Sequence, residues 1–189
     1  MRVSKEQAAR NRQKILQAAA RLLREQGLES SGVAEIMSEA GFTHGGFYGH
    51  FDSKADLAAQ TVSHIFAEKI GIWSRELAEG PEGVRQLARR YLSLDHVNDA
   101  ATACPLVSLS ADAARHPGPL REAYTQGVKG LVAVLASKLG GVDDPDCRAR
   151  AILMWTRLAG AVSLARSVDD ERLAEEILAV ALEGALEEA

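Results

Sequence analysis

Apolar residues recur at steps of three and four positions along most of the chain, which is the spacing of one face of an α-helix. The first such stretch runs from about Ala9 to Gln26, after a polar arm at residues 1–8, and Gly27 is placed to end that helix. No alternation of strands and helices is visible, and no internal repeat. The pattern therefore predicts an all-α protein.

A shorter apolar stripe predicts the next helix. Val33, Ile36, Met37 and Ala40 repeat at positions that form one face of a two-turn helix. Ser31 precedes this stripe and is the predicted side-chain N-cap, because the Ser hydroxyl accepts a hydrogen bond from the first turn.

A tight turn and a second short helix follow. Gly41 can adopt a positive φ and so end the first helix, and Thr43 offers a hydroxyl to cap the second. In the second helix Phe47 and Phe51 fall on one face. Two short helices joined by a tight glycine turn form a helix-turn-helix, whose second helix can enter a DNA major groove.

Two polar side chains of this second helix, Tyr48 and His50, lie off the line of the two phenylalanines and are therefore available to a duplex. The same helix contains Gly45, Gly46 and Gly49, which together cost roughly 3 kcal/mol of helix propensity. Packing of the phenylalanines must offset that cost, so we expect this to be the softest helix of the N-terminal domain.

The rest of the chain also has helical spacing. Ser53 caps a helix of about 25 residues, roughly 37 Å long, which is enough to connect a DNA-binding unit to a separate body. Residues 95–103 show no period and are predicted to form a loop. The remaining helices are predicted over about 81–92, 104–114, 124–139, 145–168 and 171–186.

The last two helices carry more apolar surface than one core can cover. The helix after Pro145 is apolar nearly all round, and the final helix has apolar residues on its outer side as well. Such a pair needs a second partner surface. The same pair from another copy would complete a two-fold four-helix bundle, so we predict a homodimer through the last two helices. A larger monomeric core is the alternative.

Charge is distributed unevenly along the chain. The net charge of −4 does not favour nucleic-acid binding by itself. Residues 1–24, however, hold seven Lys and Arg residues against one acid, Glu6, a net charge of +6, whereas the other 165 residues carry −10. A basic end on an acidic body is the electrostatic footprint expected of a DNA-binding surface.

Cysteine usage and hydropathy argue against a disulfide framework, a metal site and a membrane segment. Cys104 and Cys147 provide no disulfide framework, and no CxxC pair suggests a metal site. No charged-then-apolar leader opens the chain, and no apolar run approaches 18 residues. We therefore expect a cytoplasmic protein that does not enter a membrane and that uses neither a metal nor a cofactor.

The segment from Gly27 to Leu57 resembles the DNA-binding domain of TetR/AcrR-family transcriptional regulators. The family pattern is Thr, any residue, Gly, two residues, Tyr, any residue, His or Tyr, then Phe. It reads here as Thr43-His44-Gly45-Gly46-Phe47-Tyr48-Gly49-His50-Phe51. Detailed similarity covers about residues 9–60, and the segment 104–124 looks, less specifically, like a recurring piece of the family's ligand-binding domains.

The resemblance implies a three-helix DNA-binding domain at residues 1–52 and a helical ligand-binding and dimerisation domain at residues 53–189, with about nine helices in all. It also implies a homodimer that binds a pseudo-palindromic operator, most often as a repressor, and that is released when a small molecule binds the C-terminal domain. A regulator of this kind is not an enzyme.

Positions carried over from the family give the predicted DNA contacts. Tyr48, His50 and the backbone of Lys54 would hold phosphates, while Arg10, Arg12 and Lys14 could reach phosphates or a neighbouring minor groove. The residues predicted to approach the floor of the major groove are Thr43, His44, Gly45 and Gly46.

One departure from the family affects the specificity of DNA recognition. Gly46 and Gly49 expose no side chain, so direct base readout must come mainly from Thr43 and His44. Specificity is otherwise shifted to the N-terminal arm and to DNA shape.

A cavity between the helices of the C-terminal domain is expected to hold the small molecule. Trp73 and Trp155 are the best anchors, and we expect fewer than half of the candidates to touch ligand, since most are ordinary core residues. The candidate lining comprises Phe66, Ile70, Trp73, Tyr91, Cys104, Leu109, Tyr124, Val128, Trp155 and Leu158. Arg157, on an otherwise apolar helix, is predicted to pair with an anionic ligand or, preferably, with a carboxylate across the dimer.

Two other functions compete with this one. Cys104 lies at a predicted helix start, where the pKa of a thiol is lowered, so a thiol-based redox or electrophile sensor is the alternative regulator. A small buried hydrophobe is the competing interpretation of the same residue. A helical enzyme would pair Cys104 with His96 or His116, but no third orienting residue or oxyanion device can be identified.

Overall fold

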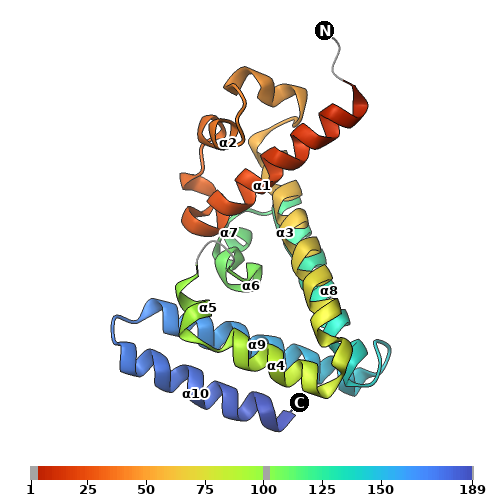
Figure 1. Cartoon of the computed structure of the whole chain (residues 1–189), viewed down its shortest axis with the longest axis vertical. Coiled ribbons are helices and arrows are strands. Elements are labelled where there is room, and N and C mark those ends of the chain that lie inside the picture. Colours follow the sequence, from red (N-terminus) through yellow and green to blue (C-terminus); the bar gives the residue numbers. More distant parts are fainter. Residues whose placement is uncertain (1–3, 100–102, 189) are drawn as a thin grey trace.

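The computed structural model describes residues 4–99 and 103–188, and every regular element in these ranges is a helix (Figure 1). The prediction of an all-α protein is confirmed. The described residues form ten α-helices and two 3₁₀ helices, against about nine helices predicted. They are α1 (Lys5–Ser30), α2 (Val33–Glu39), η1 (His44–Gly49), α3 (Lys54–Glu76), η2 (Leu77–Glu79), α4 (Pro81–Tyr91), α5 (Leu94–Asn98), α6 (Pro105–Ser108), α7 (Ser110–Arg115), α8 (Pro119–Leu139), α9 (Pro145–Ser167) and α10 (Glu171–Glu188).

The helices form two ends joined by a long middle (Figure 1). α1, α2 and η1 make one end, which we call the head (residues 4–52). The remaining described residues, from 53 onward, are called the body. α3 leaves the head and runs alongside α8, whereas α4, α5, α9 and α10 gather at the far end. α6 and α7 lie between that far end and the head.

The close approach of α3 and α8 depends on two glycines of α8. A Cβ atom on Gly127 would lie 2.1 Å from Cγ of Phe66, and one on Gly130 would lie 2.5 Å from Cδ1 of Ile70. Any side chain there would therefore overlap the side chains of α3. The two glycines are what allow α3 and α8 to form one stiff, closely packed pair.

One continuous cluster of buried side chains extends from Ile15 in α1 to Ala185 in α10. It includes Phe47 of the head and Phe66 of the body, both almost completely buried. Burying each such ring contributes roughly 2–3 kcal/mol. The two ends are thus held by shared packing as well as by α3, and the division between residues 52 and 53 stays a prediction.

The first helix begins earlier than predicted. Ser4 accepts a hydrogen bond from the amide of Gln7, 3.1 Å away, so α1 starts at Lys5 rather than near Ala9. The predicted polar arm is therefore helical from residue 5, while residues 1–3 lie outside the described residues. Gly27 leaves helical geometry at φ 79°, as predicted, but a further helical turn follows it.

Two corrections concern the segment after α4. Residues 95–103 were expected to be a loop, but Ser93 accepts a hydrogen bond from the amide of His96 and caps the short helix α5. Residues 100–102 of that prediction lie outside the described residues. The single helix predicted over 104–114 is two helices, because the backbone of the buried Leu109 departs from helical geometry between α6 and α7.

Within the described ranges, no helix is long and apolar enough to cross a membrane.

Candidate DNA-binding surface and effector cavity

The turn of the helix-turn-helix is built as the glycine pattern predicts. Gly41 has φ 80°, and its amide donates to the carbonyl of Ser38, 3.0 Å away. The amide of Phe42 donates to the carbonyl of Met37 at 2.8 Å. This pair of bonds is the Schellman arrangement, which satisfies the last carbonyls of α2 and fixes the direction in which the chain leaves it.

The entry to α2 differs from the prediction. Gly32 is the N-cap residue and makes no side-chain cap bond. Ser31, which was the predicted cap, is fully buried, and its hydroxyl donates instead to the carbonyl of Gly27, 2.7 Å away. The Ser31 hydroxyl therefore stabilises the end of α1 rather than the start of α2.

The second helix of the motif is a 3₁₀ helix, η1, rather than an α-helix. Thr43 occupies the N-cap position with an extended backbone, but its hydroxyl makes no cap bond, contrary to the prediction. Three glycines in six residues weaken α-helical geometry here. What holds η1 is the packing of Phe47 against Phe51, whose ring centroids lie 5.9 Å apart and which are both buried.

The outer face of η1 is exposed around those buried rings. The side chain of Tyr48 is 74% exposed and rests edge-on against Phe47, with ring centroids 5.1 Å apart. His50 is half-buried, with its ring 6.3 Å from that of Phe42. The other predicted contacts of this helix, Thr43, His44, Gly45 and Gly46, are all exposed.

The N-terminus of α3 lies directly after η1. Ser53 caps it by accepting from the amide of Asp56 at 3.0 Å, as predicted, and the Asp56 carboxylate in turn accepts from the amide of Asp52 at 3.1 Å. Lys54 is the first residue of the helix, so its amide has no intrahelical acceptor. Its ammonium reaches the carbonyl of Glu29 at 3.4 Å. The backbone of Lys54 is thus available to an anion such as a phosphate.

The basic residues of α1 fall into two groups. Arg10 and Lys14 are exposed, with Arg10 3.7 Å from Glu6, and the guanidinium of Arg12 lies 5.0 Å above the ring of Phe51. The second group is neutralised by the fold. Arg21 pairs with Glu39 and Glu25, which together raise its pKa, and Arg24 pairs with Glu68 at 3.3 Å. The charge free to meet DNA therefore lies near the start of α1.

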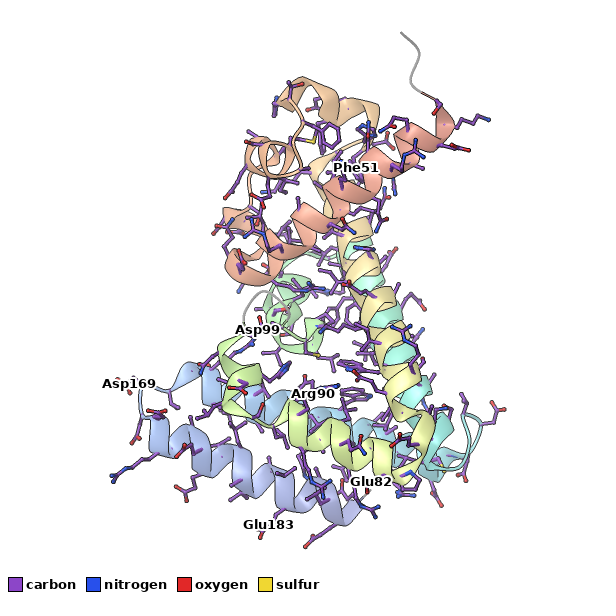
Figure 2. The ribbon with its side chains drawn as sticks, in the orientation of Figure 1. Phe51, Glu82, Arg90, Asp99, Asp169 and Glu183 are labelled. Atoms are coloured by element: carbon purple, nitrogen blue, oxygen red, sulfur yellow. The ribbon has the colours of Figure 1, made fainter. Side chains whose placement is uncertain are left out.

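A first cavity, which we call the Trp73 cavity, has a volume of about 330 Å³ and lies between α3, α4 and α5. Trp73 and Tyr91 are its two members of the predicted lining. Arg90 and Asp99, labelled in Figure 2, mark two of its sides. Its other walls are Lys69, Ile72, Glu76, Leu87, Ser93, Asp95 and His96.

A second cavity, the Tyr124 cavity, has a volume of about 430 Å³ and opens on α8 and α9. It includes Tyr124, Val128 and Trp155 of the predicted lining. Its other walls are Leu106, Lys129, Val132, Arg148, Ile152, Thr156 and Ala159.

A cluster of aromatic rings separates the two cavities. The ring of Trp73 lies 4.7 Å from that of Trp155 and 6.3 Å from that of Tyr91, while the indole N–H of Trp155 donates to the carbonyl of Leu131 at 3.0 Å. The predicted lining is therefore divided between two spaces instead of enclosing one. Five of its members, Phe66, Ile70, Cys104, Leu109 and Leu158, line neither of them.

Cys104 does not have the environment of a reactive thiol. It precedes a helix of only four residues, α6, and it is completely buried. Burial raises the pKa of the Cys104 thiol, whereas the sequence suggested that a helix start would lower it. The correction has a simple cause, because desolvation of the thiolate outweighs the few amides that such a short helix can direct at the sulfur.

Three polar residues of the Trp73 cavity have shifted pKa values. Burial raises the pKa of the Tyr91 hydroxyl well above its ordinary value and lowers that of His96 to about 4, with Arg166 adding to the second effect. Burial also lowers the pKa of Lys69, as does the charge of Arg24. Sequence reasoning missed Lys69 and considered His96 only as a catalytic partner, because neither residue stands out in the apolar spacing.

The outer face of the α9–α10 pair is apolar and exposed. Leu153 and Leu164 of α9 are 50% and 59% exposed, and Val180 of α10 is 66% exposed. A shallow groove of about 620 Å³ runs between the two helices. Arg157 pairs with Glu188 of its own chain at 2.9 Å, whereas the sequence predicted an anionic ligand or a carboxylate across the dimer. The reason is that α10 folds back over that part of α9.

A buried carboxylate connects the head to the body. Asp112 of α7 is 5% exposed and accepts a hydrogen bond from the amide of Leu28, just beyond the kink of α1, at 3.2 Å. Arg115 lies 3.3 Å from the other carboxylate oxygen. Next to this contact, His116 lies 3.7 Å from Glu29. No local sequence pattern predicts this contact, since 84 residues separate Leu28 from Asp112.

Comparison with known proteins agrees with this arrangement. The sequence profile of the family described as "Bacterial regulatory proteins, tetR family" matches residues 15–61. The chain is 28% identical to the HTH-type transcriptional regulator LmrA of Bacillus subtilis (strain 168) over 144 residues, which cover 74% of this chain and 77% of LmrA. It is 42% identical to the HTH-type transcriptional regulator AcrR of Shigella flexneri over 59 residues, 31% of this chain and 27% of AcrR.

The fold has solved counterparts. The crystal structure of the reduced form of E. coli NemR matches with a TM-score of 0.78 at 20% sequence identity, covering 93% of this chain and 95% of that one. At this identity the match concerns the fold alone.

Proposed function

The chain belongs to the TetR family of bacterial transcriptional regulators, and from this premise we propose that it is a repressor. In this proposal it binds a pseudo-palindromic operator as a homodimer and leaves the operator when a small molecule binds the body. The regulators of this family are not enzymes. The observation that carries the proposal is the exposed face of η1, where Tyr48 projects from a pair of buried phenylalanines.

The proposed DNA contacts surround that face. The hydroxyl of Tyr48 and an imidazole N–H of His50 donate to phosphates, and so does the amide at the start of α3, from Lys54. Arg10, Arg12 and Lys14 add charge from α1, near the phosphates or a minor groove.

Base readout in the proposal comes from the start of η1. Thr43 and His44 are exposed there, next to Gly45 and Gly46, whose lack of side chains lets the main chain approach the groove floor. With so few side chains on this surface, DNA shape contributes to specificity.

The proposed dimer is formed by α9 and α10. Their exposed apolar side chains and the groove between them support this proposal, because a two-fold four-helix bundle would bury apolar surface of this kind. Two heads related by that axis would read successive major grooves if their η1 helices lie about 34–36 Å apart. The alternative of a larger monomeric core is disfavoured, because α10 leaves this surface uncovered.

The proposed effector acts by shifting a population. A molecule that binds the body more tightly in one spacing of the heads than in the other favours the first spacing, by as much as its difference in affinity. The contact of Asp112 with Leu28 is the candidate route, because it joins α7 directly to the end of α1. The thiol-based alternative gains no support from the completely buried Cys104.

Tyr48→Phe tests the proposal directly. Loss of one charge-assisted hydrogen bond per head is expected to weaken operator binding roughly tenfold or more. The operator is first located by footprinting the DNA that flanks the protein's own reading frame, and affinity is then measured by fluorescence anisotropy across a salt series.

Tyr124→Phe is the matched control, because it removes the same hydroxyl from the body. Sedimentation should give dimers for both variants and for the unmodified protein. Equal operator affinity of Tyr48→Phe and the unmodified protein would refute the proposed docking, and a monomer at micromolar concentration would refute the proposed dimer.

A further inference from the structure

The Trp73 cavity contains polar atoms that no described residue satisfies. The hydroxyl of Tyr91 and Nε2 of His96 are both buried without a hydrogen-bond partner among the described residues, and their rings lie only 4.5 Å apart. Tyr91 is 2% exposed. The thiol of Cys104 lies close to its hydroxyl but is a weak hydrogen-bonding partner. Buried polar atoms of this kind normally have a partner, so the cavity has room for a group that supplies one.

A positive charge without a partner lies at the same place. Lys69 is half-buried, and no carboxylate of the described residues forms an ion pair with its ammonium. The two acids of α3 near it are already engaged, Glu68 by Arg24 at 3.3 Å and Glu76 by Arg90 at 2.8 Å. An ammonium that is partly removed from water and has no counterion attracts an anion strongly.

A second cation, the guanidinium of Arg166, adds to the positive potential near His96. Arg166 of α9 donates to the carbonyls of Val97 and His96 at 2.7 and 2.9 Å, and its charge acts on the imidazole of His96. His96 is therefore held neutral, with one ring N–H to donate. A neutral donor next to a fixed cation suits a carboxylate.

The rest of the cavity is suited to a flat apolar body. Trp73, Ile72 and Leu87 supply the apolar part of the wall, and the volume of about 330 Å³ admits a molecule of one or two fused rings. Asp95 of α5 and Asp99, the residue that follows this helix, are exposed and line the same cavity. Their charges disfavour a second anionic group at the outer end of a ligand.

We propose that the Trp73 cavity binds a small aromatic monocarboxylate, whose carboxylate is held by Lys69, Tyr91 and His96 and whose ring packs against Trp73. The inference rests on the proposed function only in assigning this molecule the role of effector. The carboxylate supplies the acceptor that the Tyr91 hydroxyl and the His96 imidazole lack and the counterion that Lys69 lacks.

Isothermal titration calorimetry of the full chain with three matched probes tests the proposal. 2-Naphthoate has the proposed anionic group, 2-naphthamide has the same ring without the charge, and 2,6-naphthalenedicarboxylate adds a second anion. We expect 2-naphthoate to bind roughly 10- to 100-fold more tightly than the amide, because a charge-assisted hydrogen bond is lost in the amide. The dicarboxylate should bind more weakly than 2-naphthoate.

Variants assign the preference to the cavity. Lys69→Met should abolish the difference in affinity between the acid and the amide, and Lys69→Arg, which keeps the charge, should retain that difference. Lys129→Met is the control, because Lys129 lines the Tyr124 cavity instead. Equal binding of acid and amide, no binding of 2-naphthoate at millimolar concentration, or loss of the preference in Lys129→Met would each overturn the inference.

Operator release is measured separately. Tight binding of 2-naphthoate that depends on Lys69 but leaves the operator complex intact would support the site and count against the proposed coupling to DNA. An operator complex that forms normally in a protein that does not bind 2-naphthoate would refute the site and leave the proposed DNA binding standing.

Discussion

The head and the body are both packed around aromatic rings, but the rings come together in different ways. In the head, Phe47 and Phe51 are four residues apart and belong to one continuous segment. In the body, Trp73, Tyr91 and Trp155 come from three helices spread over more than eighty residues of sequence. The surface of the head is therefore set by local spacing, whereas the cavities of the body are set by how distant helices meet.

The family profile, which matches residues 15–61, covers most of the head and the start of α3 but no later part of the body. Identity to AcrR is 42% over a stretch of 59 residues, whereas identity to LmrA is 28% over 144 residues. A surface that must fit the constant geometry of a duplex tolerates less change than a cavity whose ligand can differ from protein to protein.

Glycines differ sharply in packing between the two regions, and substituting a glycine of the body has the largest expected effect on stability. A Cβ on Gly49 of the head would meet no atom within 4 Å, whereas one on Gly127 would lie 2.1 Å from the buried ring of Phe66. Gly127→Ala should therefore lower the free energy of unfolding by about 3 kcal/mol, because the ring has no space to move into. Urea unfolding followed by tryptophan fluorescence measures the loss.

Gly49→Ala is the matched substitution in the head. It should leave the free energy of unfolding unchanged or raise it by up to about 1 kcal/mol, since alanine favours helical geometry over glycine. If Gly49→Ala were as damaging as Gly127→Ala, the contrast between an open head and a closely packed body would be wrong.

The turn of the helix-turn-helix could be predicted from sequence nearly to the residue, although α1 begins at Lys5 rather than near Ala9 and Ser31 does not cap α2. The positive φ of Gly41, the burial of Phe47 and Phe51 and the cap at Ser53 all follow from spacing within a few positions. What failed there was cap chemistry: the hydroxyl of Thr43 makes no cap bond, and the backbone of η1 is 3₁₀. Three glycines make those two helical forms close in energy, so sequence spacing cannot choose between them.

The body could be predicted only as a set of helices. The apolar spacing identified Trp73 and Tyr91 as inward-facing, but it could not show that the rings would divide the predicted lining between two cavities. It also gave no sign of Lys69, a polar residue whose significance depends on what three other helices place around it. Long-range packing decides such features, and no local pattern encodes it.

Asp112 connects the two regions, so its removal tests whether they act as one. Asp112→Ala leaves the buried amide of Leu28 without an acceptor and should lower the free energy of unfolding by about 2 kcal/mol. It should also weaken the response of operator binding to the effector, because the direct contact between α7 and the end of α1 is lost. Urea unfolding and anisotropy titrations with and without effector measure the two effects.

Two further variants separate the hydrogen bond from the ion pair at this contact. Asp112→Asn keeps an oxygen for the Leu28 amide and should recover most of the stability. Arg115→Ala removes the partner whose side chain is 63% exposed, and should change stability by less than about 1 kcal/mol. Head and body would have to be regarded as energetically independent if Asp112→Ala left both stability and effector response intact.

The smallest expected effect distinguishes charges within the head itself. Lys14 is exposed on α1, whereas Arg21, two turns further on, is held by Glu39 and Glu25. If Lys14 displaces counterions from the duplex, Lys14→Gln should reduce the slope of log affinity against log salt concentration by about 0.9 for each head. Arg21→Gln should leave that slope unchanged, because its charge is already compensated by the protein. Both slopes come from anisotropy titrations between low and moderate salt.

A loss of slope in Arg21→Gln equal to that in Lys14→Gln would contradict this prediction. It would mean that the ion pairs of α1 open on DNA, and that the whole basic helix, rather than its first turns, meets the phosphates.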